Sequence, residues 1–244
     1  MLAGFVLLFL AFQAPEAVGQ RLLGSFAWQS TLLLCFFAVA YAVGRIQSNR
    51  ASMAYALERD RADLALFSSL FVAALGVRFI ALALGLQFGL YAGGDPVVTS
   101  TAGIIRAVLL AVPMTFLPSI AEDMLTRGYL FRARRQWPPV VFVAASSVIY
   151  LLNHIFRLAL GPSEWAMLLA FGAVYALALV RTGSLWPAVA LHWGWNFANT
   201  TIDSLWSIDS VSAVGTRALS AGAHLVLAGV VLLLTQPRMS DGRQ

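Results

Sequence analysis

Three short polar segments interrupt long apolar stretches of the sequence, at residues 122–127, 150–154 and 192–196. Charged and titratable side chains at bilayer depth are energetically expensive and by default mark a functional site. Together these segments supply carboxylates, two imidazoles, a carboxamide and a guanidinium. This set of groups is sufficient for acid–base hydrolysis of a substrate.

The first segment contains two acids and a base on one stretch of expected helix. Asp123 and Arg127 are four residues apart, so their side chains can pair on one helix face. Glu122 points about 100° away from Asp123 around the helix. We therefore expect Asp123 to serve the ion pair while Glu122 faces a cavity. In the alternative interpretation, both acids lie at the membrane surface and balance nearby basic residues, namely Arg127, Arg132, Arg134 and Arg135.

The second segment places Tyr150 and His154 one helical turn apart on the same face. A single histidine near a helix end is more often a satisfied interfacial residue than a catalyst. Asn153 and Arg157 favour that alternative, because they indicate that this helix end is in contact with water.

The third segment carries His192 and Asn196 on one helix face, again four residues apart. Both side chains can donate hydrogen bonds to an oxyanion. Polar groups on a buried face need partners, which favours a functional site. The neighbouring Trp193 and Trp195 leave open the alternative of an aromatic belt at the membrane interface.

Metal binding is the other chemistry that these residue types permit. Glu122, His154 and His192 are a possible zinc-ligand set. However, the His-Glu-x-x-His spacing is absent, and the three ligands would come from separate helices. A site without a metal or other cofactor is therefore favoured, with zinc as the less favoured alternative.

The composition indicates an integral membrane protein. Of the 244 residues, 60% are hydrophobic and only 11% are charged, whereas soluble domains carry roughly 25% charged residues. No stretch is long enough for a separate soluble domain, so residues 1–244 are interpreted as one membrane-embedded domain with a polar, disordered tail at 237–244. The basic residues are all arginine and are scattered between apolar spans, which argues against nucleic-acid binding.

The apolar stretches predict an all-α polytopic bundle of about eight membrane helices, with the catalytic residues on three or four of them. The first and seventh are the weakest of these candidates. The expected spans are residues 2–14, 22–44, 66–91, 103–121 running on toward 131, 139–156, 166–181, 184–201 and 217–235.

The distribution of arginines predicts that both termini are cytoplasmic. With this orientation only three arginines fall in loops on the opposite side, namely Arg21, Arg157 and Arg217. The cytoplasmic loops and tail would hold ten, namely Arg45, Arg50, Arg59, Arg61, Arg132, Arg134, Arg135, Arg181, Arg238 and Arg243. The arginine-only, alanine- and leucine-rich composition favours a bacterial source, and hence the inner (plasma) membrane.

In these three segments the sequence resembles the CPBP family of CAAX proteases and bacteriocin-processing (Abi) membrane proteins, which includes the type II CAAX prenyl endopeptidases. The family motifs Glu-Glu-x-x-x-Arg, Phe-x-x-x-His and His-x-x-x-Asn/Asp occur in the same order. The resemblance covers about residues 103–202 and extends to the flanking sequences 127–131 and 182–187. Two positions depart from the motifs, since Asp123 replaces a glutamate and Tyr150 replaces a phenylalanine.

The resemblance implies a glutamate-dependent intramembrane endopeptidase. It assigns the general base to Glu122 and a water-positioning role to His154. It also assigns stabilisation of the oxyanion to His192 and Asn196. The remaining motif residues, Asp123, Arg127 and Tyr150, would support these groups.

The expected substrate is a peptide, a lipidated protein or a membrane protein, and the sequence does not specify whether it is prenylated or how the chain assembles. Two alternatives stay open. Some members of this family are linked to bacteriocin immunity or act as regulators and scaffolds without proteolysis. A proton-relaying transporter is also conceivable, but the internal repeats typical of transporters are absent.

Overall fold

The computed structural model describes residues 2–58, 63–134 and 136–236. The expected tail at 237–244 lies outside these residues.

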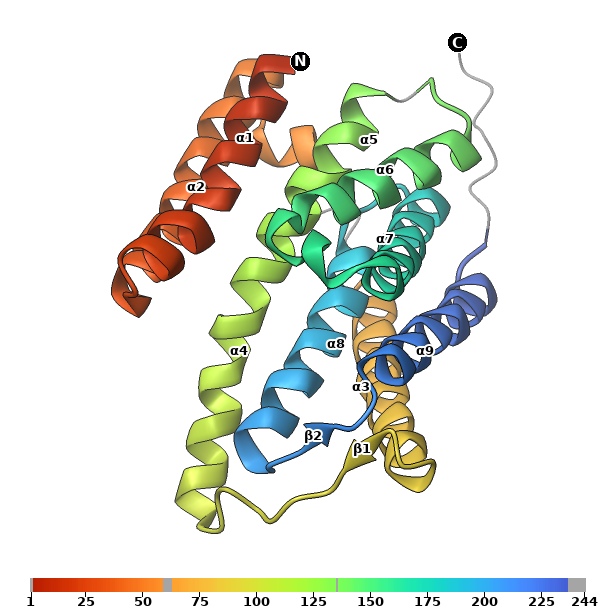
Figure 1. The fold of residues 1–244 in the computed structure, drawn as a ribbon. Coiled ribbons are helices and arrows are strands. Elements are labelled where there is room, and N and C mark those ends of the chain that lie inside the picture. Colours follow the sequence, from red (N-terminus) through yellow and green to blue (C-terminus); the bar gives the residue numbers. More distant parts are fainter. Residues whose placement is uncertain (1, 59–62, 135, 237–244) are drawn as a thin grey trace.

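The described chain is almost entirely helical (Figure 1). The first half contains α1 (Leu2–Ala14), the π-helix η1 (Pro15–Leu22), α2 (Phe26–Gln47), the 3₁₀ helix η2 (Ala51–Tyr55), α3 (Leu64–Gln87), β1 (Tyr91–Ala92) and α4 (Thr101–Asp123). The second half contains the π-helix η4 (Met124–Gly128), α5 (Tyr129–Ala133), α6 (Pro139–Asn153), the 3₁₀ helix η5 (Ile155–Leu160), α7 (Pro162–Thr182), α8 (Trp186–Leu205), β2 (Asp209–Ser210) and α9 (Ala213–Leu234).

Several of these helices have the length and apolarity of membrane spans, in agreement with an integral membrane protein. Six qualify among the described residues, namely Leu2–Leu22, Phe26–Gln47, Leu64–Gln87, Thr101–Ala133, Pro162–Thr182 and Ala213–Leu234. Helix α6 is apolar but has only 15 residues. Helix α8 has 20 residues but carries several polar side chains, and it does not qualify. A total of eight membrane-crossing helices therefore stays a prediction.

The first helix is longer than the expected span of residues 2–14. It continues without interruption through the π-helical turns of η1 to Leu22. Pro15 stands at the junction, where its ring removes a backbone N–H donor. Glu16 and Arg21, which lowered the apparent apolarity of this region, form an exposed ion pair along η1.

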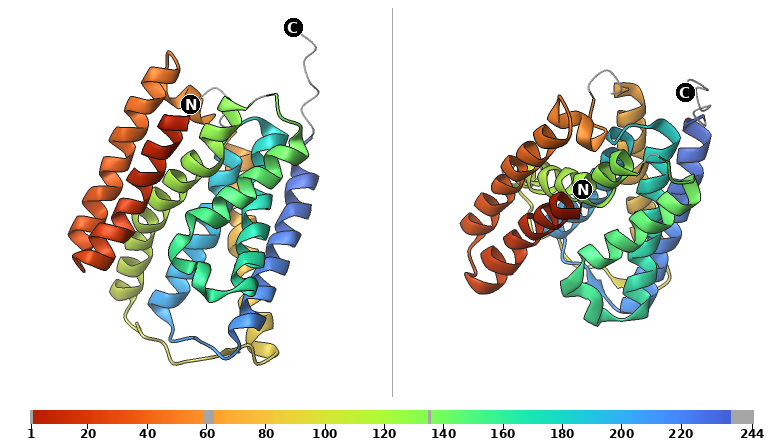
Figure 2. Two further views of the ribbon diagram at one scale, coloured as in Figure 1. Left: turned by 45° about the horizontal axis from the view of Figure 1, so that its top comes forward. Right: turned by 90° about the horizontal axis from the view of Figure 1, so that it is seen from above.

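Helix α8 occupies the centre of the bundle. It packs against α3, α4 and α7, while α9 packs against α3 and α7. The α1–α2 hairpin lies on the far side of α4 from α7 and α9, which is seen most clearly in the view from above (Figure 2). Eleven of the 20 residues of α8 are buried, so this polar helix is shielded by its apolar neighbours.

A short two-stranded antiparallel sheet joins the loop after α3 to the loop after α8. Tyr91 of β1 pairs with Ser210 of β2. This sheet is the exception to the expected all-α fold, and it holds Tyr91 beside the central helices (Figure 1).

Close packing between α3 and α8 depends on Gly194. A Cβ atom at this position would lie 2.6 Å from the carbonyl oxygen of Phe71 and 3.0 Å from the side chain of Ala74. Both distances are too short for a methyl group. The two backbones can therefore approach this closely only with glycine at residue 194, as is common where membrane helices pack.

We predict that Gly194→Ala lowers the free energy of unfolding by about 1–3 kcal/mol through overpacking. Thermal unfolding in detergent micelles, followed by tryptophan fluorescence, measures this change. The matched control is Gly76→Ala, because no atom lies within 4 Å of the added Cβ there. Equal stability of the Gly194→Ala variant and the wild type would contradict the packing argument.

Candidate active site

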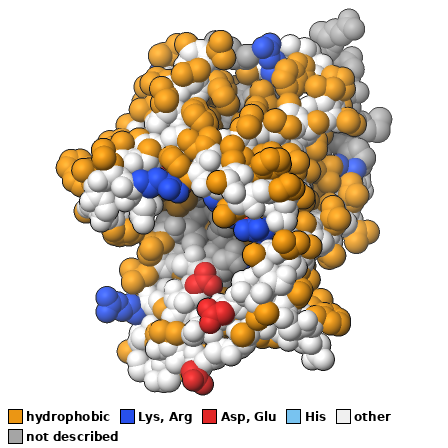
Figure 3. Space-filling model, viewed as in Figure 1, with side chains coloured by type: hydrophobic (Ala, Val, Ile, Leu, Met, Phe, Trp, Pro, Cys, Tyr) orange, Lys and Arg blue, Asp and Glu red, His pale blue; other side chains and the backbone are white. Residues whose placement is uncertain are grey.

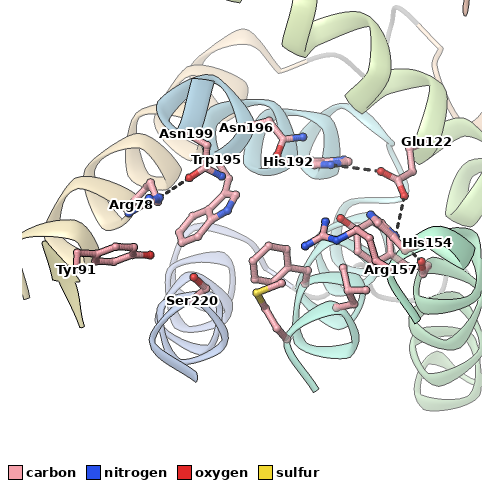
Figure 4. A pocket seen from close by; sticks show the side chains of 14 residues that line it. Arg78, Tyr91, Glu122, His154, Arg157, His192, Trp195, Asn196, Asn199 and Ser220 are labelled. Atoms are coloured by element: carbon pink, nitrogen blue, oxygen red, sulfur yellow. Dashed lines mark hydrogen bonds and ion pairs between the residues drawn. The ribbon is translucent and has the colours of Figure 1, made fainter. Parts of the chain in front are cut away.

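The three polar segments meet at one partly open cavity of about 290 Å³. Glu122 enters it from the end of α4, His154 from the residue that follows α6, and His192 and Asn196 from α8 (Figure 4). Residues from separate helices therefore converge on one site, as the sequence analysis expected. Tyr150 also lines the cavity, whereas Asp123 and Arg127 lie behind it.

The segment around Glu122 has an unusual backbone. Directly after Asp123 the α-helix gives way to the π-helical turn η4. The Thr126 hydroxyl donates to the Glu122 carbonyl oxygen at 2.8 Å, and the Ser146 hydroxyl on α6 donates to the Thr126 carbonyl oxygen at 3.1 Å. Short π-helical turns inside α-helices are rare and occur frequently at functional sites.

Asp123 and Arg127 form the expected ion pair across this turn, and both side chains are completely buried. The guanidinium group also lies over the rings of Tyr150 and Tyr175, at 5.1 Å from each centroid. The alternative in which both acids lie at the membrane surface is wrong, because every residue from 121 to 130 is buried. A buried carboxylate requires such a partner, since an unpaired charge in the interior is strongly unfavourable.

Asp123 has a second partner that the sequence spacing does not reveal. Its Oδ1 atom accepts a hydrogen bond from Nδ1 of His192 at 2.9 Å. The His192 ring is also stacked on Tyr175, with centroids 4.9 Å apart and planes inclined by 20°. Asp123 therefore orients the histidine of α8 in addition to pairing with Arg127.

Glu122 is surrounded by nitrogen atoms. Asn153 donates from Nδ2 to its Oε1 at 2.9 Å. Nδ1 of His154 lies 3.5 Å from the same oxygen, and Nε2 of His192 lies 3.6 Å from Oε2. Only 7% of Glu122 is exposed. The carboxylate thus has one direct donor and two imidazoles just beyond hydrogen-bond distance, and it also borders the cavity.

The hydrogen bonds of the two histidines indicate where their protons lie. Nδ1 of His154 is 2.9 Å from the carbonyl oxygen of Tyr150, which can only accept, so this nitrogen carries the proton. By the same argument Nδ1 of His192 is the donor to Asp123. In neutral rings both Nε2 atoms are therefore unprotonated and can accept a proton.

The interpretation of this helix end as wet is wrong for Asn153, whereas Arg157 is exposed. Asn153 is buried, and its backbone and side-chain oxygens both accept hydrogen bonds from Gln13 of α1, at 2.8 and 2.9 Å. These bonds fix the side-chain amide so that its nitrogen faces Glu122. Neither Gln13 nor the contact of Asn153 with Glu122 was predicted from the sequence, although a glutamine inside an apolar helix such as Gln13 was a usable signal.

Trp195 of α8 is packed inside the protein, so the interpretation as an interfacial belt is wrong for this residue, whereas Trp186 and Trp193 are half-buried. Trp193 contacts the rings of Phe71 and Phe116 and donates to the Thr115 hydroxyl at 3.1 Å. Trp195 is 3% exposed. Asn196, on the next turn of α8 after His192, donates to the Ser119 hydroxyl at 3.1 Å and lines the cavity.

The donor geometry does not favour a metal site. Within the described ranges no three His, Cys, Asp or Glu residues are grouped so that they could hold a metal ion. The nitrogen of His154 that lies nearest Glu122 is already bonded to the Tyr150 carbonyl oxygen. A metal ligand needs a free lone pair on the nitrogen that faces the ion.

Residues 104–198 match the sequence model of the family described as Type II CAAX prenyl endopeptidase Rce1-like. The matched segment contains all three polar segments and excludes α1, α3 and α9. The match agrees with the resemblance of these motifs to the CPBP family of CAAX proteases. No curated protein matches the chain.

We predict that Arg127→Leu lowers the free energy of unfolding by about 3–5 kcal/mol, because it leaves the Asp123 carboxylate buried without its cation. The control is Arg21→Leu, which removes one partner of the exposed Glu16–Arg21 pair. That change should cost about 1 kcal/mol or less. Thermal unfolding of both variants in the same detergent measures the difference. Equal effects of the two substitutions would contradict the role assigned to the buried pair.

Proposed function

We propose that this chain, whose residues 104–198 carry the Rce1-like sequence of the CAAX protease family, is an intramembrane endopeptidase in which Glu122 activates water. The family assignment implies a CAAX-type membrane protease in general terms. The glutamate-dependent mechanism rests on one observation: the Glu122 carboxylate lies between two imidazoles, at 3.5 and 3.6 Å, and borders the cavity. At these distances a water molecule in the cavity can contact the carboxylate and an imidazole nitrogen at the same time.

In the first step, the Glu122 carboxylate accepts a proton from the bound water, and the oxygen attacks the carbonyl carbon of the peptide. Asn153 and Gln13 hold the carboxylate in position through their hydrogen bonds. The unprotonated Nε2 atom of His192 lies 3.6 Å from Oε2 of Glu122 and can share the proton. General base catalysis of this kind contributes roughly 10²–10⁴-fold to the rate.

In the second step, negative charge develops on the carbonyl oxygen of the substrate. The amide of Asn196 lines the cavity one turn beyond His192 and can donate to this oxygen. His192 can also donate from Nε2 once it has taken up the proton, because Asp123 and Tyr175 hold its ring in place. Removal of one such donor typically costs about 10²–10³-fold in rate.

In the last step, the C–N bond of the tetrahedral intermediate breaks, and the proton taken from water passes to the leaving amine. Glu122 or His192 then returns to its starting state. Every atom and proton in this sequence comes from the substrate, the water and the named side chains. The mechanism therefore requires neither a metal nor another cofactor.

The proposed substrate is a peptide or a lipidated or membrane-bound protein that reaches the cavity from the bilayer. The proposed location is the bacterial inner membrane with both termini in the cytoplasm, on the basis of the arginine distribution. The alternative is a non-proteolytic scaffold or bacteriocin-immunity protein of the same family. Such a protein would keep its function after loss of Glu122.

We predict that Glu122→Gln abolishes cleavage of a prenylated reporter peptide, because the amide cannot accept the proton from water. Asn196→Ala should lower kcat by about 10²–10³-fold. Cleavage is measured by mass spectrometry with the purified protein in nanodiscs. The control is Glu16→Gln on η1, which removes an exposed carboxylate and should retain full activity. Full activity of the Glu122→Gln variant would refute the mechanism.

We also predict that 1,10-phenanthroline and EDTA leave the rate of cleavage unchanged. A zinc peptidase assayed in parallel provides the positive control for chelation. A loss of activity that is reversed by added Zn²⁺ would contradict the metal-free mechanism and would favour the alternative zinc-ligand set of Glu122, His154 and His192.

A further inference from the structure

The cavity has a second polar region, which contains Arg78 of α3 and Asn199 of α8. Arg78 is only 7% exposed, and its Nε atom donates to Oδ1 of Asn199. Its guanidinium carbon lies 5.7 Å from the ring centroid of Tyr91 and 5.6 Å from that of Trp195. All four residues line the cavity, on the opposite side of His192 and Asn196 from Glu122 (Figure 4).

Arg78 differs from the other two arginines at the site, the buried Arg127 and the exposed Arg157, because it lacks a carboxylate partner within the described chain. Arg127 pairs with Asp123, and Arg157, which also lines the cavity, pairs with Glu164. No carboxylate in the described ranges forms an ion pair with Arg78. Asp203, an exposed residue one turn beyond Asn199, interacts with Arg78 only at longer range.

The terminal amino groups of Arg78 make no hydrogen bond with any residue of the described chain, since its one bond uses Nε. A buried cation without a carboxylate partner is costly to maintain. Because the guanidinium group lines the cavity, a ligand there can supply both the missing charge and the missing acceptors. Guanidinium groups bind carboxylates with two parallel hydrogen bonds, which matches this requirement.

The surroundings of Arg78 hold the guanidinium plane in a fixed orientation. Asn199 fixes its Nε atom, and the rings of Tyr91 and Trp195 flank it. Asn199 follows His192 by seven residues on α8, which places it about 10 Å further along the helix axis. A ligand that contacts both regions would therefore extend along α8 inside the cavity.

We propose that Arg78 is a carboxylate-binding residue that determines which substrates the cavity accepts. It would bind a carboxylate of the ligand beside Asn199, about two helical turns along α8 from His192. This inference rests on the proposed function for the identity of the ligand as a peptide. The carboxylate would come from the C-terminus of the peptide or from an acidic side chain. Arg78 and Tyr91 lie outside residues 104–198, so this subsite is built by segments that the family match does not cover.

Figure 3 shows a recess below the centre of the face, with arginine side chains along its upper edge and acidic side chains below it. Hydrophobic side chains cover most of the surface above the recess.

The test measures binding in the Glu122→Gln background, where no cleavage occurs. The probes are three fluorescent farnesylated peptides of equal length: one with a free C-terminal carboxylate, one with a C-terminal carboxamide, and one amidated peptide with a glutamate near its end. Dissociation constants in nanodiscs are compared for intact Arg78, Arg78→Gln and Arg78→Lys. Arg157→Gln is the matched control, because Arg157 lines the same cavity and already has a carboxylate partner.

We expect at least one carboxylate peptide to bind tenfold or more tightly than the neutral peptide when Arg78 is intact. Arg78→Gln should remove this preference, Arg78→Lys should retain part of it, and Arg157→Gln should leave it unchanged. The peptide that shows the preference identifies the source of the carboxylate. Equal binding of all three peptides to the protein with intact Arg78, or no binding at all, overturns the proposal without reference to any variant.

Persistence of the preference in Arg78→Gln, or its loss in Arg157→Gln, would also overturn the assignment. Size-exclusion chromatography of each variant establishes that it is folded. If the protein with Glu122 intact cleaves none of the peptides while the carboxylate preference is present, the proteolytic function fails and the carboxylate subsite stands.

Discussion

Two adjacent carboxylates, Glu122 and Asp123, are buried inside a helical bundle that has little water to solvate them. Each must find its partners within the protein, because an unpaired charge in such an environment is strongly unfavourable. Asp123 finds Arg127 and His192. Glu122 keeps one direct donor, Asn153, and otherwise faces the cavity. Asp123 is therefore neutralised by its partners, whereas Glu122 is held in place but can still react.

The need to provide partners for the buried site residues extends to helices that carry none of the three motifs. Gln13 of α1 fixes the amide of Asn153 and so reaches Glu122 indirectly. On the opposite side, His224 of α9 accepts a hydrogen bond from the Tyr175 hydroxyl at 2.8 Å, and Tyr175 stacks on His192. The first and last helices thus position the two central residues of the site. The polar helix α8 can occupy the centre only because these partners surround it.

The sequence predicted the parts of this arrangement that depend on local periodicity. The pairing of Asp123 with Arg127 follows from a spacing of four residues, and the helical character of the chain follows from its long apolar stretches. Contacts between distant segments could not be predicted in this way. Neither the bond from Asp123 to His192 nor that from Gln13 to Asn153 has a local signal, because each depends on how whole helices pack.

The difference between local spacing and long-range packing also explains what the sequence did not predict. Asn153 was interpreted as a residue in contact with water because it stands beside a histidine and an arginine near a helix end. Its burial becomes evident only when α1 is placed against α6. No partner for Arg78 can be identified from the sequence, since Asn199 lies 121 residues away and Tyr91 is held nearby by a two-residue strand. Long-range packing, rather than local propensity, determines the site.

The most direct test of the central claim is a comparison of peptide termini in the membranes of source cells. One population carries the wild-type protein, and the other carries the Glu122→Gln variant at matched abundance. Proteolysis by Glu122 predicts new termini that are present with the wild type and absent with the variant, and their sequences would identify the substrate. Identical termini in the two populations, together with an unchanged cellular phenotype, would contradict proteolysis and favour a scaffold or immunity protein.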